Sequence, residues 1–317
     1  MSKSSYQIKL GIDYQEWMKY FLMVNKPNLL QSWAYGEAKA KSQGWKVMRG
    51  IIFNGNQPIA MFQVLSKKIC FINIVRLNQG PLWLVESPSI EQVKEVFYLI
   101  KKRWNILTAC FLLLAPNLEN TSVLNKLLFS LKFYKRIRTT WNSGLIDLHP
   151  SELELRDSLR GNWRRRLKTA EKNNLKFIVS QEEQDLNWLM QKYADYQQQK
   201  SFQGTPIPLL QALFKCSIDM HQVWMAFVTH RDERIAGMLV TYYGKACTPL
   251  VSWQSDKGRE LNTGNFILWN LVLFSKQQGC IWFEQGGIDK NNSDVARFKR
   301  GIPSHEYELM GEYFSFI

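Results

Sequence analysis

The sequence predicts an α+β fold divided into two domains of similar design. At 317 residues the chain exceeds one typical domain and suits two. Hydrophobic residues make up 45% of it and aromatic residues 13%, which is enough for packed cores and excludes a disordered chain. The third observation is an order of predicted elements that recurs in the two halves.

Each half is predicted to contain a β-hairpin. The turn Asn54-Gly55-Asn56 is typical of a tight connection between antiparallel strands. Both hairpins have an Ile-Ala pair just after the turn, at Ile59 and Ile235, so they are interpreted as copies of one unit. Their strands are expected at 46–53 and 58–65 in the first half, and at 223–229 and 234–240 in the second.

After each hairpin, the chain is expected to form a further strand, a helix and an apolar strand. The helices are expected near 89–103 and 262–278, and the apolar strands near 107–114 and 280–283. A strand at 144–148 is followed by Pro150, which predicts a first domain of residues 1–150 and a second of residues 151–317.

The charge balance indicates an anionic partner. The chain has 41 Lys and Arg against 27 Asp and Glu, a net charge of +14. An excess of this size favours RNA, a phosphorylated carrier or an anionic membrane surface. The alternative is an organism whose proteins are generally basic.

Several features indicate a reduced, cytoplasmic protein. Residues 1–17 contain no continuous apolar run of the kind found in a secretory signal. The most apolar stretch, 106–115, is about half the length that spans a bilayer, so no integral membrane segment is expected. The five cysteines lack paired spacing, and we expect neither disulfides nor a metal site.

A strongly basic segment opens the second predicted domain. Residues 156–176 contain eight Lys and Arg and two acidic residues. On a helix, Trp163, Leu167 and Ala170 share one face, while a cationic ridge covers the rest. The ridge is expected to bind phosphate groups, with RNA favoured over lipid; the alternative is a merely solvated face. Its residues are Arg164, Arg165, Arg166, Lys168 and Lys172.

Near the C-terminus, an apolar strand ends in Glu284 and a glycine pair, Gly286-Gly287, followed by Asp289. Glycines at the end of a strand indicate a loop that another group approaches closely. Ten residues later the sequence reads Phe298-Lys299-Arg300-Gly301. Near the N-terminus, Gln31, Tyr35 and Lys39 have the spacing of one helical face.

Together these motifs resemble those of the Fem-type (FemABX) aminoacyl-tRNA-dependent peptidyltransferases, over most of the chain and in the expected order. The family has a Gln-Ser entry motif, an Arg-rich helix, and a glycine-pair strand end followed by a Phe-Lys loop. Its fold is a duplication of the acyl-CoA N-acyltransferase (GNAT) core, a hairpin followed by strand, helix and strand. The resemblance therefore implies two tandem GNAT-like domains with mixed sheets flanked by helices.

The resemblance also implies a reaction, in which an amino acid passes from a charged tRNA to the amine of an acceptor and forms an amide bond. In the family the acceptor is typically a peptidoglycan precursor, and the tRNA is a donor substrate, so no cofactor is implied. Lys299 would stabilise the oxyanion, and Lys39 and Lys200 would hold acceptor phosphates. Lys200 stands where the family has an arginine, which leaves the acceptor open. The implied substrate-binding residues are Gln31, Tyr35, Lys39, Lys200, Gly286, Gly287 and Asp289; the implied tRNA-binding residues are Arg164, Arg165, Arg166, Lys168, Lys172 and Arg300.

Two matters stay open at this point. Glu284 and Asp289 are both candidates for the general base. An acyl-CoA-dependent N-acyltransferase is the alternative activity, but the nearest match to its phosphate loop, residues 234–239, fails at its last position and falls in a predicted strand. A third and weaker alternative is an RNA-binding module without activity.

Overall fold

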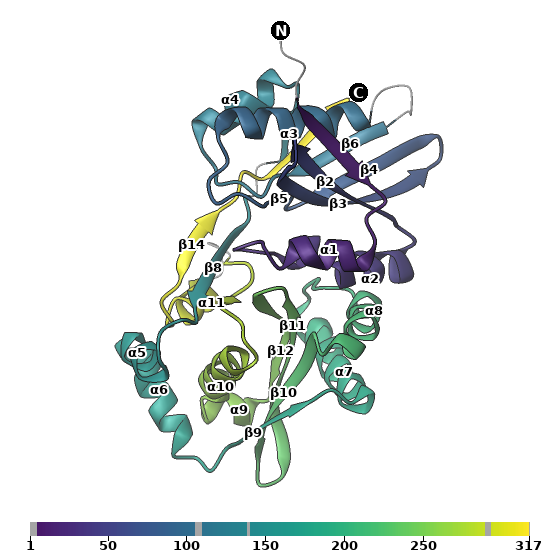
Figure 1. The fold of residues 1–317 in the computed structure, drawn as a ribbon. Helices are drawn as coiled ribbons and strands as arrows, with labels where there is room; N and C mark the ends of the chain where they lie inside the picture. Colours follow the sequence, from purple (N-terminus) through teal and green to yellow (C-terminus); the bar gives the residue numbers. More distant parts are fainter. Residues whose placement is uncertain (1–4, 105–109, 138–139, 289–292, 317) are drawn as a thin grey trace. The chain divides into compact units, whose positions relative to one another are not determined.

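The computed structural model describes residues 5–104, 110–137, 140–288 and 293–316. They form two compact units (Figure 1). Unit 1 comprises residues 1–141 together with 307–317, and unit 2 comprises residues 142–306.

Unit 1 is built on a mixed sheet in the order β1-β2-β3-β4-β6-β15-β7, with β5 paired to β3. Neighbours are antiparallel except β4 and β6, which run parallel. The strands are β1 (Tyr6–Leu10), β2 (Lys46–Asn54), β3 (Gln57–Ile69), β4 (Ile72–Asn78), β5 (Leu82–Trp83), β6 (Cys110–Ala115), β7 (Tyr134–Ile137) and β15 (Glu312–Phe316). The helices are α1 (Tyr14–Phe21), η1 (Leu29–Gln31), α2 (Trp33–Gln43), α3 (Ile90–Arg103) and α4 (Ser122–Ser130).

Unit 2 has a sheet in the order β14-β8-β13-β12-β11-β10-β9, in which β12 and β13 are parallel. The strands are β8 (Asn142–Asp147), β9 (Lys176–Ser180), β10 (Val223–His230), β11 (Glu233–Tyr243), β12 (Ala246–Gln254), β13 (Trp282–Glu284) and β14 (His305–Glu308). The helices are α5 (Glu152–Ser158), α6 (Gly161–Glu171), α7 (Glu183–Lys200), α8 (Ile207–Ser217), η3 (Ile218–Met220), α9 (Asp256–Glu260), α10 (Thr263–Gln277) and α11 (Ser293–Lys299).

The α+β prediction and the repeated hairpins are confirmed. Strand β2 pairs with β3 through Asn54 and Gln57, and β10 pairs with β11 through His230 and Glu233. Each hairpin is followed by a strand, a helix (α3 or α10) and a strand (β6 or β13), as the sequence predicts. Part of the strand expected near 107–114 lies outside the described residues.

The chain divides differently from a single cut at Pro150. Strand β8, expected to end the first domain, pairs with β13 in the sheet of unit 2, where Asp147 lies opposite Trp282. The C-terminal strand β15 instead lies between β6 and β7 in the sheet of unit 1. Strand pairing depends on which open sheet edge a segment meets, so the local sequence does not reveal this exchange.

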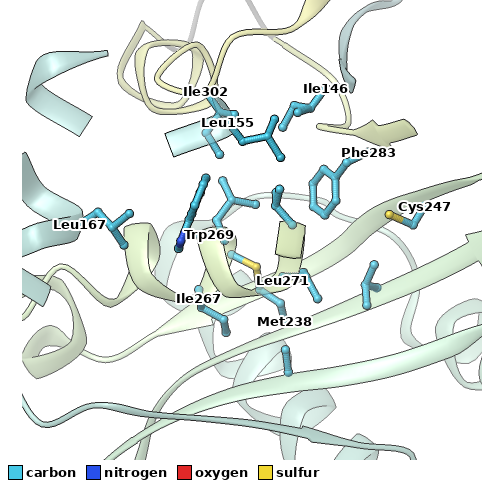
Figure 2. Close-up of a cluster of buried hydrophobic side chains, with 14 of the residues drawn as sticks. Ile146, Leu155, Leu167, Met238, Cys247, Ile267, Trp269, Leu271, Phe283 and Ile302 are labelled. Carbon is cyan, nitrogen blue, oxygen red and sulfur yellow. The ribbon is translucent and has the colours of Figure 1, made fainter. Parts of the chain in front are cut away.

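Helices cover both faces of the central strands of unit 2 (Figure 1). On one face, α10 packs against β10 and β11, and α5 and α6 complete the cluster through Leu155 and Leu167. Figure 2 shows Trp269 of α10 and Phe283 of β13 within this cluster. On the other face, α7 and α8 pack through Leu189 and Leu210. Strand β13 is therefore fixed by pairing with β12 and β8 and by packing in the cluster that α5, α6 and α10 complete.

Candidate functional site

The most promising site lies where β13 ends. Lys299, the last residue of α11, donates from Nζ to the carbonyl of Gly287 at 2.6 Å. In return, Gln285 Nε2 donates to the carbonyl of Lys299 at 2.7 Å. Gly286 adopts a left-handed backbone, φ +69°, which turns the chain toward the lysine. The two motifs that the sequence placed twelve residues apart are thus in direct contact.

Burial changes the ionisation of this lysine. Burial lowers the pKa of Lys299, while the nearby Glu284 acts in the opposite direction. Glu284 is itself buried, and its Oε2 accepts a hydrogen bond from Tyr243 Oη at 2.9 Å. Lys299 therefore faces a less aqueous environment than a surface lysine, in which its charge acts more strongly on a nearby group.

Beside Lys299 is a cavity of about 510 Å³ that lies entirely within unit 2. Its walls are largely apolar, and Lys299, Gln285 and Gln254 supply polar groups. A cavity of this size, with few polar groups on apolar walls, has the character of a small-molecule or acyl-group site.

Only some of the residues around the glycine pair belong to the described part of the chain. An added Cβ on Gly286 would lie 3.7 Å from Lys299 Nζ, an ordinary van der Waals contact, so the positive φ and not a lack of space favours glycine there. Ser143 Oγ donates to the carbonyl of Gly286 at 3.0 Å and fixes the segment from β8. Asp289, the predicted substrate contact, lies outside the described residues.

Helix α6 has the two faces that the sequence predicts. Trp163, Leu167 and Ala170 are buried, whereas the ridge residues Arg165, Arg166, Lys168 and Lys172 are exposed and Arg164 is partly exposed. Trp163 also contacts the Lys299 segment, because its ring centroid lies 6.2 Å from that of Phe298. The apolar face of the basic helix is therefore the element that positions the ridge next to α11.

Two of the predicted phosphate-binding arginines already have an acidic partner. Arg300 forms a two-pronged ion pair with Glu306, at 2.7 and 2.9 Å, and the pair raises the pKa of Arg300. Arg164 lies 3.8 Å from Asp157. The ion pair with Glu306 offsets the charge of Arg300, and a phosphate contact by Arg300 would compete with it.

At the N-terminal motif the prediction of one shared helical face is wrong. Helix α2 begins at Trp33, with Ser32 Oγ accepting from Tyr35 N at 3.2 Å, and Gln31 precedes it in η1. Gln31 is completely buried; its Nε2 donates to the carbonyls of Gln63 and Asn78, and its Oε1 accepts from Gln63 N. The amide ties η1 to strands β3 and β4, so the structure gives Gln31 a role in the fold and no surface for a substrate.

Lys39, in contrast, belongs to a group of cations. Burial and the neighbouring Arg76 and Lys67 lower the pKa of Lys39, and burial raises the pKa of Tyr35. Lys39 and Lys67 both donate to Gln43, the former to its side chain and the latter to its carbonyl. Lys200, the other predicted acceptor contact, is exposed at the end of α7 in unit 2.

The sequence did not reveal the hydrogen bond between Tyr243 and Glu284. Tyr243 ends β11, and a strand–helix segment separates it from Glu284, so no short motif links them. The continuous apolar run along β11 was the available signal, but it indicates a buried strand and not a partner.

Each unit contains the hairpin, strand, helix and strand of the GNAT core, so the chain has a tandem GNAT-like fold. The comparisons agree: the family described as "Acetyltransferase (GNAT) domain" matches residues 157–300. Among solved structures, FemX superimposes with a TM-score of 0.83 at 14% identity, over 98% of this chain and 97% of its own. No curated protein matches the chain.

Two further structures share the fold. The C-terminal domain of a putative lysylphosphatidylglycerol synthetase from Agrobacterium fabrum has a TM-score of 0.54 at 12% identity, covering 95% of this chain and 92% of that one. A tandem GNAT protein from the clavulanic acid biosynthesis pathway has a TM-score of 0.57 at 6% identity, with 98% of each chain covered. These likenesses show a shared fold, and the family match supports an acyltransferase. Across the described residues, no helix is both long and apolar enough to cross a bilayer.

Proposed function

We propose that the chain transfers an aminoacyl group from a charged tRNA to the amine of an acceptor, a peptidoglycan precursor or a related peptide. The observation that carries the proposal is the contact of Lys299 with the glycine segment at the wall of an apolar cavity, beside the basic helix α6. The lysine at the wall of the cavity suits acyl transfer, and the basic helix suits a nucleic-acid donor.

Amide formation from an ester requires the amine to attack the carbonyl carbon. The carbonyl oxygen then carries negative charge until the tRNA hydroxyl leaves and the C–O bond breaks. Lys299 is proposed to stabilise this oxyanion, since an ammonium has three N–H donors and the bond to Gly287 uses one. The amine must also lose a proton, and Glu284, near Lys299, is a candidate to accept it, as is Asp289.

The donor is proposed to bind along α6. Its exposed ridge presents cations to phosphate groups, while its buried face is engaged in the core. FemX and the lysylphosphatidylglycerol synthetase share this fold, and the second name describes a lipid bearing an amino acid. Because charged tRNA is a cytoplasmic substrate, we propose a cytoplasmic site of action, with tRNA as donor and no bound cofactor.

The acceptor is proposed to bring a phosphate to Lys39 in unit 1. Arg76 supports this assignment: its Nη2 bonds Glu312 at 2.8 Å, but its buried Nε has no hydrogen-bond partner among the described residues. Tyr35 stays a proposed acceptor contact in unit 1, and Lys200 stays a proposed phosphate contact in unit 2. The acceptor would be phosphorylated or lipid-linked.

An acyl-CoA-dependent N-acyltransferase is the second candidate, because the GNAT family match covers residues 157–300. Against it, the nearest match to a CoA phosphate loop, residues 234–239, lies inside strand β11. A loop that cradles a pyrophosphate must offer free backbone N–H groups, which a paired strand does not.

A competition assay tests the proposal. Purified protein would be given a cell extract as the source of acceptors, with either a mixture of labelled aminoacyl-tRNAs or labelled acetyl-CoA. Label from the tRNA pool in an alkali-stable amide is the expected result. Label only from acetyl-CoA would establish the second candidate and exclude the first.

A further inference from the structure

A second cavity in unit 2, of about 620 Å³, adjoins the one beside Lys299. Asp294 and Phe298 line both cavities, so the two cavities are neighbours. Among the described residues, the second cavity is bordered by three arginines, Arg160, Arg166 and Arg297, against one acid, Asp294. The guanidinium of Arg297 lies 3.9 Å from Asp294, which leaves a cationic excess.

Two buried N–H donors in its wall have no partner among the residues that the structure describes. Asn265 and Trp163 are each 4% exposed, and Asn265 Nδ2 and Trp163 Nε1 have no hydrogen-bond partner within the described parts of the chain. An unpaired buried donor costs free energy, and a protein rarely retains two in one place without use. Both are N–H groups, so the ligand that satisfies them must supply acceptors.

Two helices also begin at this cavity. Arg160 precedes α6, and Asn265 lies in the first turn of α10; neither helix has a side-chain cap bond at its N-terminus. The first N–H groups of a helix and its dipole favour an anion at this end. Guanidinium groups, unpaired N–H donors and two helix N-termini thus all select the same chemistry.

We propose that this cavity binds a phosphate group of the acyl donor, next to the cavity that takes the reacting ester. The assignment deepens the proposed function, because it specifies where the donor's phosphates lie relative to Lys299. The shared chemistry is a phosphate ester, and its two sources are the 3′ end of tRNA and the phosphoadenosine part of coenzyme A. The first is favoured because the ridge of α6 begins at the same cavity.

The test is direct binding by calorimetry of three probes: a short RNA hairpin ending in CCA, coenzyme A and inorganic pyrophosphate. The variants are Arg160→Gln, Arg297→Gln and Asn265→Leu; Arg166 stays intact because it belongs to the ridge. Each variant is expected to weaken binding of the RNA about 10-fold or more, as charged hydrogen bonds are lost. Arg231→Gln, at the exposed β10–β11 turn, is the matched control and should bind as wild type does.

Asn265→Leu gives a second readout. Since Nδ2 has no hydrogen-bond partner in the described part of the chain, its replacement by an apolar group of similar size should leave the melting temperature unchanged or raise it. Unchanged affinity for all three probes in all three variants would overturn the phosphate site, even if aminoacyl transfer proceeds. Weakened binding of coenzyme A alone would uphold the phosphate site and contradict the tRNA-dependent function.

A different observation concerns the tip of the β3–β4 hairpin in unit 1. Phe71 is 90% exposed, and Ile69 and Ile72 beside it are about half exposed, whereas large apolar side chains are normally covered. Lys67 and Lys68 are exposed directly behind the tip, and residues 57–78 contain no Asp or Glu. An apolar tip with two lysines directly behind it fits a bilayer surface that bears anionic headgroups.

We infer that this hairpin inserts into the headgroup region of an anionic membrane. The probe is a vesicle of phosphatidylcholine with or without phosphatidylglycerol. Phe71→Ser should abolish sedimentation with anionic vesicles and Lys68→Gln should weaken it, whereas Leu153→Ser, an exposed leucine on α5, should not change it. Wild-type protein that ignores anionic vesicles, or a dimer that Phe71→Ser dissociates, would overturn the inference.

Discussion

Trp163 of α6 packs directly against the backbone of Gly301, two residues after Lys299. An added Cβ on Gly301 would lie 1.9 Å from Trp163 Cδ1, far inside van der Waals contact. Only glycine therefore fits at this position, and the contact links the cationic helix to the segment that holds Lys299.

Gly301→Ala should consequently destabilise unit 2. Overpacking of this kind costs about 1–3 kcal/mol, and chemical denaturation would measure it. Gly161→Ala is the matched control, because Gly161 begins the same helix and an added Cβ meets nothing within 4 Å. The control should be neutral or stabilising by up to about 1 kcal/mol. Equal stabilities for both variants would contradict the packing described here.

Lys299→Met should act on turnover and not on binding. Loss of one oxyanion donor typically lowers kcat about 100- to 1000-fold, and KM for both substrates should change little. Steady-state kinetics with both substrates varied would test this. Arg300→Met should instead weaken donor binding if Arg300 releases Glu306 to bind a phosphate of the donor. Normal turnover of Lys299→Met would show that the glycine segment is purely structural.

Replacement of Arg164, Arg165, Arg166 and Lys168 by Gln should weaken tRNA binding and reduce its salt dependence. Each lost phosphate contact removes about one unit from the slope of log K against log salt. The fold should persist, because Trp163 and Leu167 stay in the core. Filter binding across a salt series measures the slope, and a slope equal to that of wild type would mean that the ridge is merely solvated.

Lys39→Ala should raise the KM of the acceptor about 10-fold, as expected for a lost charge-assisted hydrogen bond, and leave donor binding intact. Lys41→Ala is its control, since Lys41 is an exposed lysine on the same helix. An equal loss for donor and acceptor would be inconsistent with a phosphate contact specific to the acceptor.

The pH dependence of turnover provides a further test. Lys299 acts as an ammonium, and burial lowers its pKa below the usual value for lysine. Turnover should therefore fall at a lower pH on the alkaline side than an ordinary lysine would allow. Glu284→Gln removes the group that opposes this shift, so the alkaline limb should move to still lower pH. A kcat profile is the measurement; a limb that moves upward would contradict the sign.

Local patterns identified much of the candidate site. The apolar spacing of Trp163, Leu167 and Ala170 predicted the buried face of α6, and the turn signals predicted both hairpins. The proximity of the glycine pair to Lys299 followed from resemblance, and the structure shows the contact as a hydrogen bond. Gln31 was misplaced, because the cap at Ser32 starts the helix at Trp33, two residues after Gln31.

By itself, the sequence determined the element order, the two faces of α6 and the charged and glycine-containing segments, because side-chain periodicity and turn chemistry act over a few residues. The tertiary structure alone decided that β8 joins the sheet of unit 2 and β15 the sheet of unit 1, and that Tyr243 meets Glu284. It alone brought Asn265 and Trp163 to one cavity, with donors that no other described residue pairs. Such pairings depend on which surfaces meet when the whole core packs, and that choice minimises the free energy of the entire chain and not of any segment in it.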